Sequence, residues 1–122
     1  MGVKMGSYYF IDLDNVQSIC RGDKVKMLRY LNQFNELIPQ RKDYLKLSLM
    51  NGDRFMIRQI LHKMSPQLQF FGIKGVTIPI QRMEFEYETI PINELEILVN
   101  DIIFKLEGAI KEVSNIIDSN FE

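Results

Sequence analysis

The sequence of 122 residues contains one cysteine, one histidine and no tryptophan. A single cysteine excludes an internal disulfide. One cysteine and one histidine also leave too few nitrogen and sulfur ligands for an ordinary zinc site. No apolar run approaches the roughly 20 residues of a membrane span, and the first residues contain no apolar core of a signal peptide. These absences predict a cytoplasmic protein that does not insert into a membrane.

The sequence also has almost no net charge. The 15 Lys and Arg residues nearly balance 16 Asp and Glu, and no basic run exceeds two residues. The sequence therefore lacks the basic surface of a nucleic-acid partner, and we expect no nucleic-acid binding. It also has no glycine-rich phosphate loop, so we expect no autonomous kinase or ATPase activity.

What is present is helical periodicity. Apolar residues recur at spacings of three and four, and Gly, Asp and Pro residues separate the periodic segments. Asp12 or Asp14, Asp23 and Asp53 are the expected N-caps of the first three helices. The helices are expected over residues 12–20, 23–50, 53–71, 75–88 and 91–118.

Two prolines qualify this expectation. Pro39 should bend or interrupt the second helix, because proline removes a backbone donor and crowds the preceding turn. Pro79 is compatible with the fourth helix only in its first turn.

The last segment has the clearest pattern, a heptad seam typical of helix bundles. Its members are Leu95, Val99, Ile102, Leu106, Ala109, Val113 and Ile116. We therefore predict an all-α fold over residues 10–120, preceded by a flexible N-terminus at 1–9. Four helices form an antiparallel up-down-up-down bundle, with the segment 12–20 as a short N-terminal lid helix. A coiled-coil dimer through the same seam is the alternative. We favour a monomer because the other helices need this seam to bury their own apolar stripes.

The only histidine, His62, lies in the middle of the third predicted helix. The core stripe of that helix lies roughly 130–150° away around the helix axis, at 100° per residue. His62 is therefore predicted to face solvent. Its neighbours on the polar face are Arg58, Gln59, Ser65, Pro66 and Gln69.

Two aromatic residues lie near the same face. Phe55 and Phe70 are either exposed anchors for a partner or are packed beneath the short first helix; we favour the second option slightly.

Short motifs around His62 resemble those of the histidine phosphotransfer (HPt) domain of two-component phosphorelays. In that family a hydrophobic residue follows the phospho-accepting histidine by two positions, as Met64 does here. A Gly-Ala-like pair, matched by Gly72-Ile73, begins ten positions after the histidine, and a hydrophobic-Glu pair, matched by Met83-Glu84, ends the next helix. Upstream, Gly22-Asp23, Phe34 and Asp53 fit further family positions. The resemblance covers roughly residues 10–118.

The resemblance implies a phosphocarrier in which His62 is the phospho-acceptor. Gln59, Lys63, Ser65, Pro66 and Gln69 would form its supporting or docking face. The implied partners are receiver domains of response regulators and a hybrid histidine kinase. The receiver would bring the aspartate and the Mg²⁺, so this chain would need no cofactor of its own. Gly72 would end the histidine's helix, and Glu84 would cap or brace its neighbour without a part in transfer.

Two positions depart from the family. The family often has lysine three residues after the histidine and a small residue at the fourth, where this chain has Ser65 and Pro66. The missing lysine removes a positive charge that would steady the phosphoryl group, and Lys63 replaces it only in part. Pro66 should kink or loosen the helix. These departures favour an alternative function, a binding module on the same fold that docks receiver domains or another protein without being phosphorylated.

Overall fold

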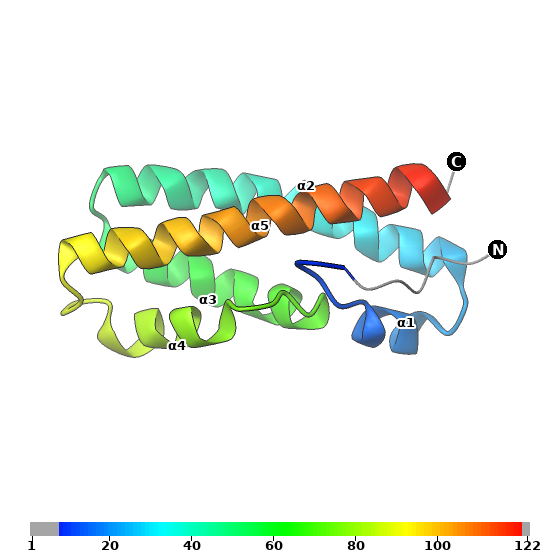
Figure 1. Cartoon of the computed structure of the whole chain (residues 1–122), viewed down its shortest axis with the longest axis horizontal. Helices are drawn as coiled ribbons and strands as arrows, with labels where there is room; N and C mark the ends of the chain where they lie inside the picture. The colour runs from blue at the N-terminus through cyan, green and yellow to red at the C-terminus, as the bar shows by residue number, and fades with distance from the viewer. Residues whose placement is uncertain (1–7, 121–122) are drawn as a thin grey trace.

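The computed structural model describes residues 8–120 (Figure 1). Every regular element in this range is a helix, which confirms the all-α class. None of these helices is long and apolar enough to cross a membrane. The helices are α1 (Asp14–Cys20), α2 (Lys24–Met50), α3 (Arg54–Phe70), α4 (Thr77–Glu86) and α5 (Ile92–Asn120).

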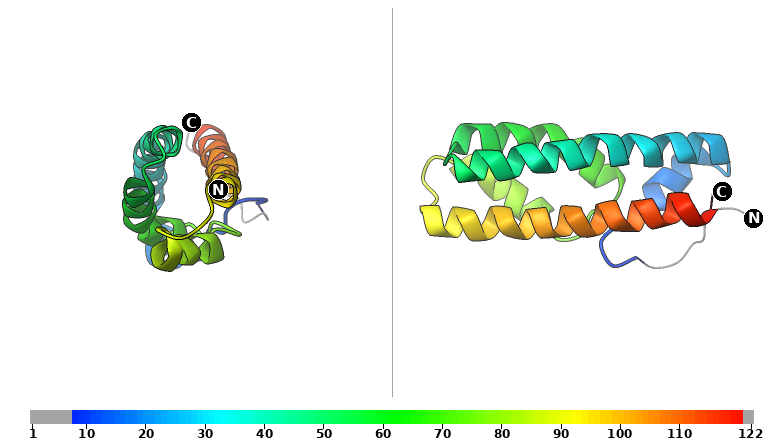
Figure 2. Two further views of the ribbon diagram at one scale, coloured as in Figure 1. Left: turned by 90° about the vertical axis from the view of Figure 1, so that its left-hand side faces the viewer. Right: turned by 90° about the horizontal axis from the view of Figure 1, so that it is seen from above.

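The two longest helices form the frame of the molecule. Helices α2 and α5 pack along one another, α3 packs against α2, and α4 packs against both α3 and α5. Seen end-on in Figure 2, the helices surround a common axis. Helix α1 packs against α2 near one end of the frame. The result is a helical bundle in which α3 and α4 lie side by side.

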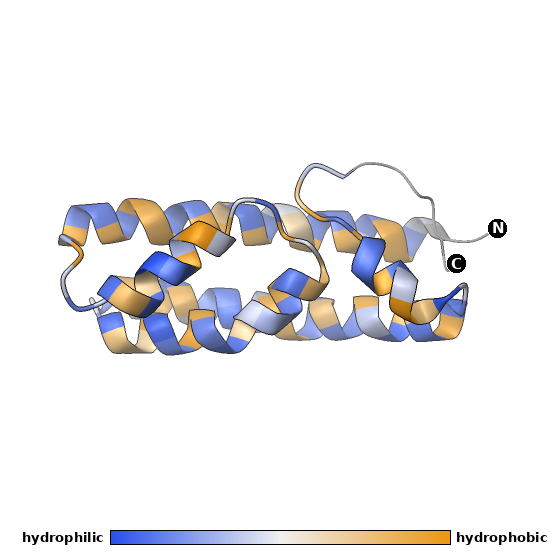
Figure 3. Ribbon diagram, turned by 90° about the horizontal axis from the view of Figure 1, so that it is seen from below, coloured by the Kyte–Doolittle hydropathy of each residue, from blue (hydrophilic) through white to orange (hydrophobic). Residues whose placement is uncertain are grey.

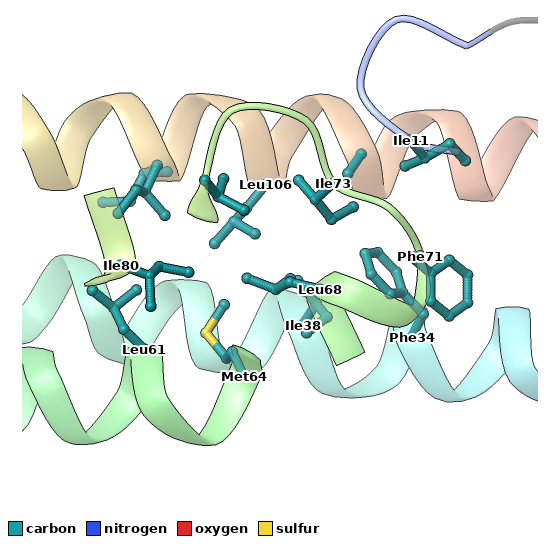
Figure 4. Packing of buried hydrophobic residues seen from close by; sticks show 14 of the residues in the cluster. Ile11, Phe34, Ile38, Leu61, Met64, Leu68, Phe71, Ile73, Ile80 and Leu106 are labelled. Carbon is teal, nitrogen blue, oxygen red and sulfur yellow. The ribbon is translucent and has the colours of Figure 1, made fainter. Parts of the chain in front are cut away.

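One apolar core joins all five helices. Hydrophilic and hydrophobic residues alternate along the helices in Figure 3, the pattern of amphipathic helices that bury one face. In Figure 4, side chains from α2, α3, α4 and α5 converge between the ribbons. The seven seam residues of α5 are all between 0% and 3% exposed. The chain buries this seam against its own helices, which argues against a coiled-coil dimer through it.

The aspartates at two helix starts act as predicted. An Oδ1 atom of Asp23 accepts a hydrogen bond from the Lys26 N–H, and Asp53 accepts one in the same way from Met56. The expectation for α1 was less accurate. Asp14 is its first helical residue and not its cap, and Leu13 occupies the N-cap position without a side-chain hydrogen bond. Asp12, which lies one residue before the N-cap position, accepts a hydrogen bond from the Asp14 N–H at 2.9 Å.

The prolines do not divide the helices. Helix α2 continues through Pro39 and α3 continues through Pro66, so of the two effects expected at Pro39, a bend or an interruption, the interruption is wrong. Each proline removes one backbone donor, but packing on either side outweighs that loss, since Ile38 and Leu68 are at most 1% exposed. Pro79 lies in the first turn of α4, as expected.

A strap formed by residues 8–13 crosses α5 and the connection between α3 and α4. The backbone N–H groups of Tyr9, Phe10 and Ile11 all donate to the carboxylate of Glu112, at 2.8–3.1 Å. Gly108 makes room for the Phe10 ring, because a Cβ atom there would lie 2.2 Å from it. Of the segment expected to be flexible, residues 1–7 lie outside the described range.

We expect the seam of α5 to dominate stability. Ile102 is 0% exposed, so Ile102→Ala should lower the free energy of unfolding by about 2–5 kcal/mol through lost burial and a residual cavity. Ile97, on the same helix, is 72% exposed, and Ile97→Ala should change it by at most about 0.5 kcal/mol. Urea denaturation followed by circular dichroism measures both values. Equal effects of the two substitutions would contradict the assigned core.

Candidate functional site

His62 lies in the middle of α3 and faces outward. Its side chain is 65% exposed, whereas Leu61 and Met64 beside it are at most 1% exposed. The alternation follows from helix geometry, because residues 61 and 64 share the buried stripe and residue 62 does not. The prediction of an outward-facing histidine is confirmed.

A carboxylate from the neighbouring helix meets this histidine. Oε2 of Glu84, on α4, lies 3.3 Å from Nδ1 of His62. Met83, the preceding residue, is fully buried in the core and anchors α4 at this level. With Nδ1 turned toward the carboxylate, a neutral ring that keeps its proton on Nδ1 has its free lone pair on Nε2, on the opposite side of the ring.

Glu84 is held in turn by an arginine. The Arg58 Nη2 donates to Oε1 of Glu84 at 2.9 Å, and Arg58 Nε donates to the Glu84 backbone carbonyl at 3.3 Å. The guanidinium carbon lies 5.3 Å from the centre of the Tyr87 ring, within the range of a cation–π interaction. Both side chains of the ion pair are a little over one quarter exposed. The carboxylate therefore has one oxygen on Arg58 and the other near His62.

The remaining predicted site residues spread along the same face of α3. Gln59 and Ser65 are half-buried, and Lys63, Pro66 and Gln69 are exposed. Ser65 and Gln69 line a groove of about 500 Å³ between α3, its connection to α4, and α4 itself. Other lining residues include Leu68, Gly72, Thr77, Ile80 and Gln81. The groove lies toward the C-terminal end of α3 from His62, whereas Arg58 lies one turn toward the N-terminal end.

Gly72 shapes one wall of this groove. Its φ of +58° is left-handed, and an added Cβ would lie 2.7 Å from the Cβ of Asp12 in the strap. The Ile73 N–H returns to the Leu68 carbonyl at 3.0 Å and closes the end of α3. Gly72 therefore ends the helix as predicted.

The aromatic residues near the face divide into two groups. Phe55 is 52% exposed, and its ring lies 6.4 Å from that of Tyr87, so it does not pack beneath α1 as expected. Phe70 is half-buried, with its ring 5.1 Å from that of Tyr30 on α2. Phe85, adjacent to Glu84, is 84% exposed and had no place in the sequence-based prediction.

Sequence reasoning placed Arg58 on the correct face but gave it no role, and it treated Glu84 as a brace only. The spacing of four residues between Arg58 and His62 does put both on one face of a helix. What the sequence did not show is the register between α3 and α4, which brings Glu84 to both residues.

Comparison with known proteins adds no relative. No protein-family model, no curated protein and no solved structure matches this chain significantly.

We expect the Arg58–Glu84 pair to be coupled energetically. A double-mutant cycle with Arg58→Ala and Glu84→Ala should give about 1 kcal/mol, the upper end for such pairs, because the Nη2–Oε1 hydrogen bond and partial burial fix the geometry of the two side chains. The matched control is the Lys46–Glu107 pair, whose side chains are nearly half exposed. A hydrogen bond from Lys46 lowers the pKa of Glu107, but exposure screens the pair, and we expect about 0.5 kcal/mol or less. Urea denaturation of all variants tests this, and a coupling near zero for Arg58–Glu84 would contradict the assigned geometry.

Proposed function

We propose that this chain is a histidine phosphotransfer protein, which relays a phosphoryl group between receiver-domain aspartates through His62. The observation that carries this proposal is the His62 side chain, which is 65% exposed and has its Nδ1, not its Nε2, 3.3 Å from Glu84 Oε2. The only histidine of the chain thus combines access for a large partner with an orienting carboxylate.

The proposal includes the finer architecture. Helices α2, α3, α4 and α5 form an antiparallel up-down-up-down bundle, and α1 is its lid. Support comes from the packed pairs α2–α3, α3–α4, α4–α5 and α2–α5, which close a ring. The short connections between consecutive helices favour antiparallel neighbours. In α1, Asn15 Nδ2 donates to the Gln69 carbonyl at 3.4 Å, which ties the lid to the end of α3.

The chemistry needs little from the carrier. The Nε2 lone pair attacks the phosphorus of an aspartyl phosphate, the P–O bond to the aspartate breaks, and its electron pair returns to that carboxylate. The N–P bond forms while the proton stays on Nδ1. The ring then carries a positive charge facing the Glu84 carboxylate. The same steps in reverse pass the phosphoryl group to a second aspartate.

The partners follow from the groups that this transfer needs and the carrier lacks. Phosphoryl transfer depends mainly on positioning and charge neutralisation, and a receiver domain supplies the aspartate and the Mg²⁺. The carrier would act in the cytoplasm as a monomer, downstream of a hybrid histidine kinase. Gln59, Lys63, Ser65, Pro66 and Gln69 would surround His62 in the docked complex.

The decisive substitution is His62→Gln. A phosphorylated receiver with Mg²⁺ should label the wild-type chain, and acid but not base should release the label, as for a phosphoramidate. His62→Gln should accept no phosphoryl group, and its unfolding free energy should change by at most about 0.5 kcal/mol because the site is exposed. Lys111→Gln, at an exposed position of α5, is the control and should be labelled normally. Labelling that persists in His62→Gln would place the acceptor elsewhere.

A second function is favoured by Ser65 and Pro66, which depart from the phosphocarrier pattern. Under it the same face docks a receiver domain without accepting a phosphoryl group. Wild-type protein that binds a receiver from its own genome, yet stays unlabelled by every receiver of that genome, would establish this alternative.

The docking face is tested by Ser65→Glu. Ser65 lines the groove beside His62, so a carboxylate there should repel the acidic pocket of a receiver and weaken binding about tenfold or more. Ser119→Glu adds the same charge at an exposed site in the last turn of α5 and should leave binding unchanged. Titration calorimetry measures binding, and circular dichroism checks helicity. Unchanged binding and transfer in Ser65→Glu would exclude this face.

A further inference from the structure

The Glu84 carboxylate connects Arg58 to His62, and its two oxygens are not equivalent. Oε1 accepts from Arg58 Nη2 at 2.9 Å, and Oε2 lies 3.3 Å from His62 Nδ1. Arg58 Nε donates a second hydrogen bond to the Glu84 backbone carbonyl, so Arg58 contacts both the side chain and the main chain of Glu84. A glutamate without these bonds would rotate among several conformers. With them, its orientation is restricted and Oε2 is held 3.3 Å from the imidazole Nδ1.

Aromatic rings hold the arginine in place. The guanidinium lies over Tyr87, and the Phe55 ring lies on Tyr87 at an interplanar angle of 62°. Arg58 and His62 are also four residues apart on one helix, so their side chains emerge on the same face. Arg58, Glu84 and His62 thus form a chain of contacts that runs from a half-buried cation to an exposed ring.

The charge of Arg58 also compensates that of the Glu84 carboxylate. A phosphoryl group carries close to two negative charges, and an unpaired carboxylate next to it would be repulsive. Arg58 adds one positive charge directly on that carboxylate, so the pair contributes no net charge beside His62. The lysine that the HPt family often has three residues after the histidine is replaced here by Ser65, and Arg58 lies on the preceding turn instead.

We propose that Arg58 is a positioning residue for phosphoryl transfer at His62. It holds Glu84 so that the imidazole keeps its proton on Nδ1 and presents Nε2 to the phosphoryl group. This inference rests on the phosphocarrier function proposed above. Arg58 acts through Glu84 and exchanges no proton or phosphoryl group itself.

The first measurement is the tautomer of His62, which long-range ¹⁵N–¹H NMR reports without any partner protein. With a neutral ring, the wild type should be mainly the Nδ1–H form. Arg58→Gln removes the charge and the paired hydrogen bonds, so the population should shift toward the Nε2–H form that free imidazole side chains prefer. Arg58→Lys keeps the charge and should restore the wild-type population in part. The control is Arg82→Gln, which removes an arginine of α4 paired with Glu86 and Glu94, away from His62.

The second measurement is the rate at which His62 is labelled by phosphoramidate, a small-molecule phosphoryl donor. We expect Arg58→Gln to slow labelling about tenfold, the lower end of the effect that loss of an orienting partner has at metal-bound histidines, whose ring is held in the same way. Arg58→Lys should recover part of the rate, and Arg82→Gln should match the wild type. Circular dichroism confirms that each variant remains folded.

The outcomes separate the two proposals. An unchanged tautomer population in Arg58→Gln overturns the positioning role, even if receivers label the wild type. A slower rate with an unchanged tautomer also overturns it, since Arg58 would then act by charge alone. If the tautomer shifts and phosphoramidate labelling slows, but no receiver labels the wild type, the positioning role stands and the phosphocarrier function fails.

Discussion

Burial of the α5 seam is the constraint on which the other packing depends. Seven apolar residues repeat along one helix, and all are at most 3% exposed. Covering so long a stripe requires a partner of similar length, and α2 is the only other described helix that long. Once α2 and α5 lie along one another, α3 attaches to α2 and α4 attaches to α5. Helices α3 and α4 must then meet on the remaining side of the core.

The candidate site is a consequence of that meeting. Met64 of α3 and Met83 of α4 are both fully buried, which sets the height and rotation of each helix. The outward-facing positions of the two helices then meet at the surface between α3 and α4, where the Glu84 carboxylate contacts both His62 and Arg58. No loop is involved in this triad. Its three side chains therefore all emerge from helices that the core holds in place.

Local features of the fold were predictable and long-range ones were not. Helix spacing and aspartate caps depend on residues within one turn, so the sequence shows five helices and the outward direction of His62. Pro39 does not interrupt α2 because the cost of one lost backbone hydrogen bond is local, whereas the burial of Ile38 and Leu45 that offsets this cost depends on the other helices. The role of Glu84 and the Glu112 contacts with the strap depend on residues 22 to 103 positions apart, and no periodicity encodes those pairings.

His62 has an ion pair on one side and a groove on the other. Toward the N-terminal end of α3, the Arg58–Glu84 pair lies against the ring and is itself neutral. Toward the C-terminal end, Ser65 borders the groove formed with Gly72 and Thr77. A lysine at position 65 would place four methylenes and a charge at that border, whereas serine leaves the groove open. Arg58, on the preceding turn, is instead paired with Glu84, so the groove beside Ser65 stays open and no unpaired carboxylate lies beside the ring.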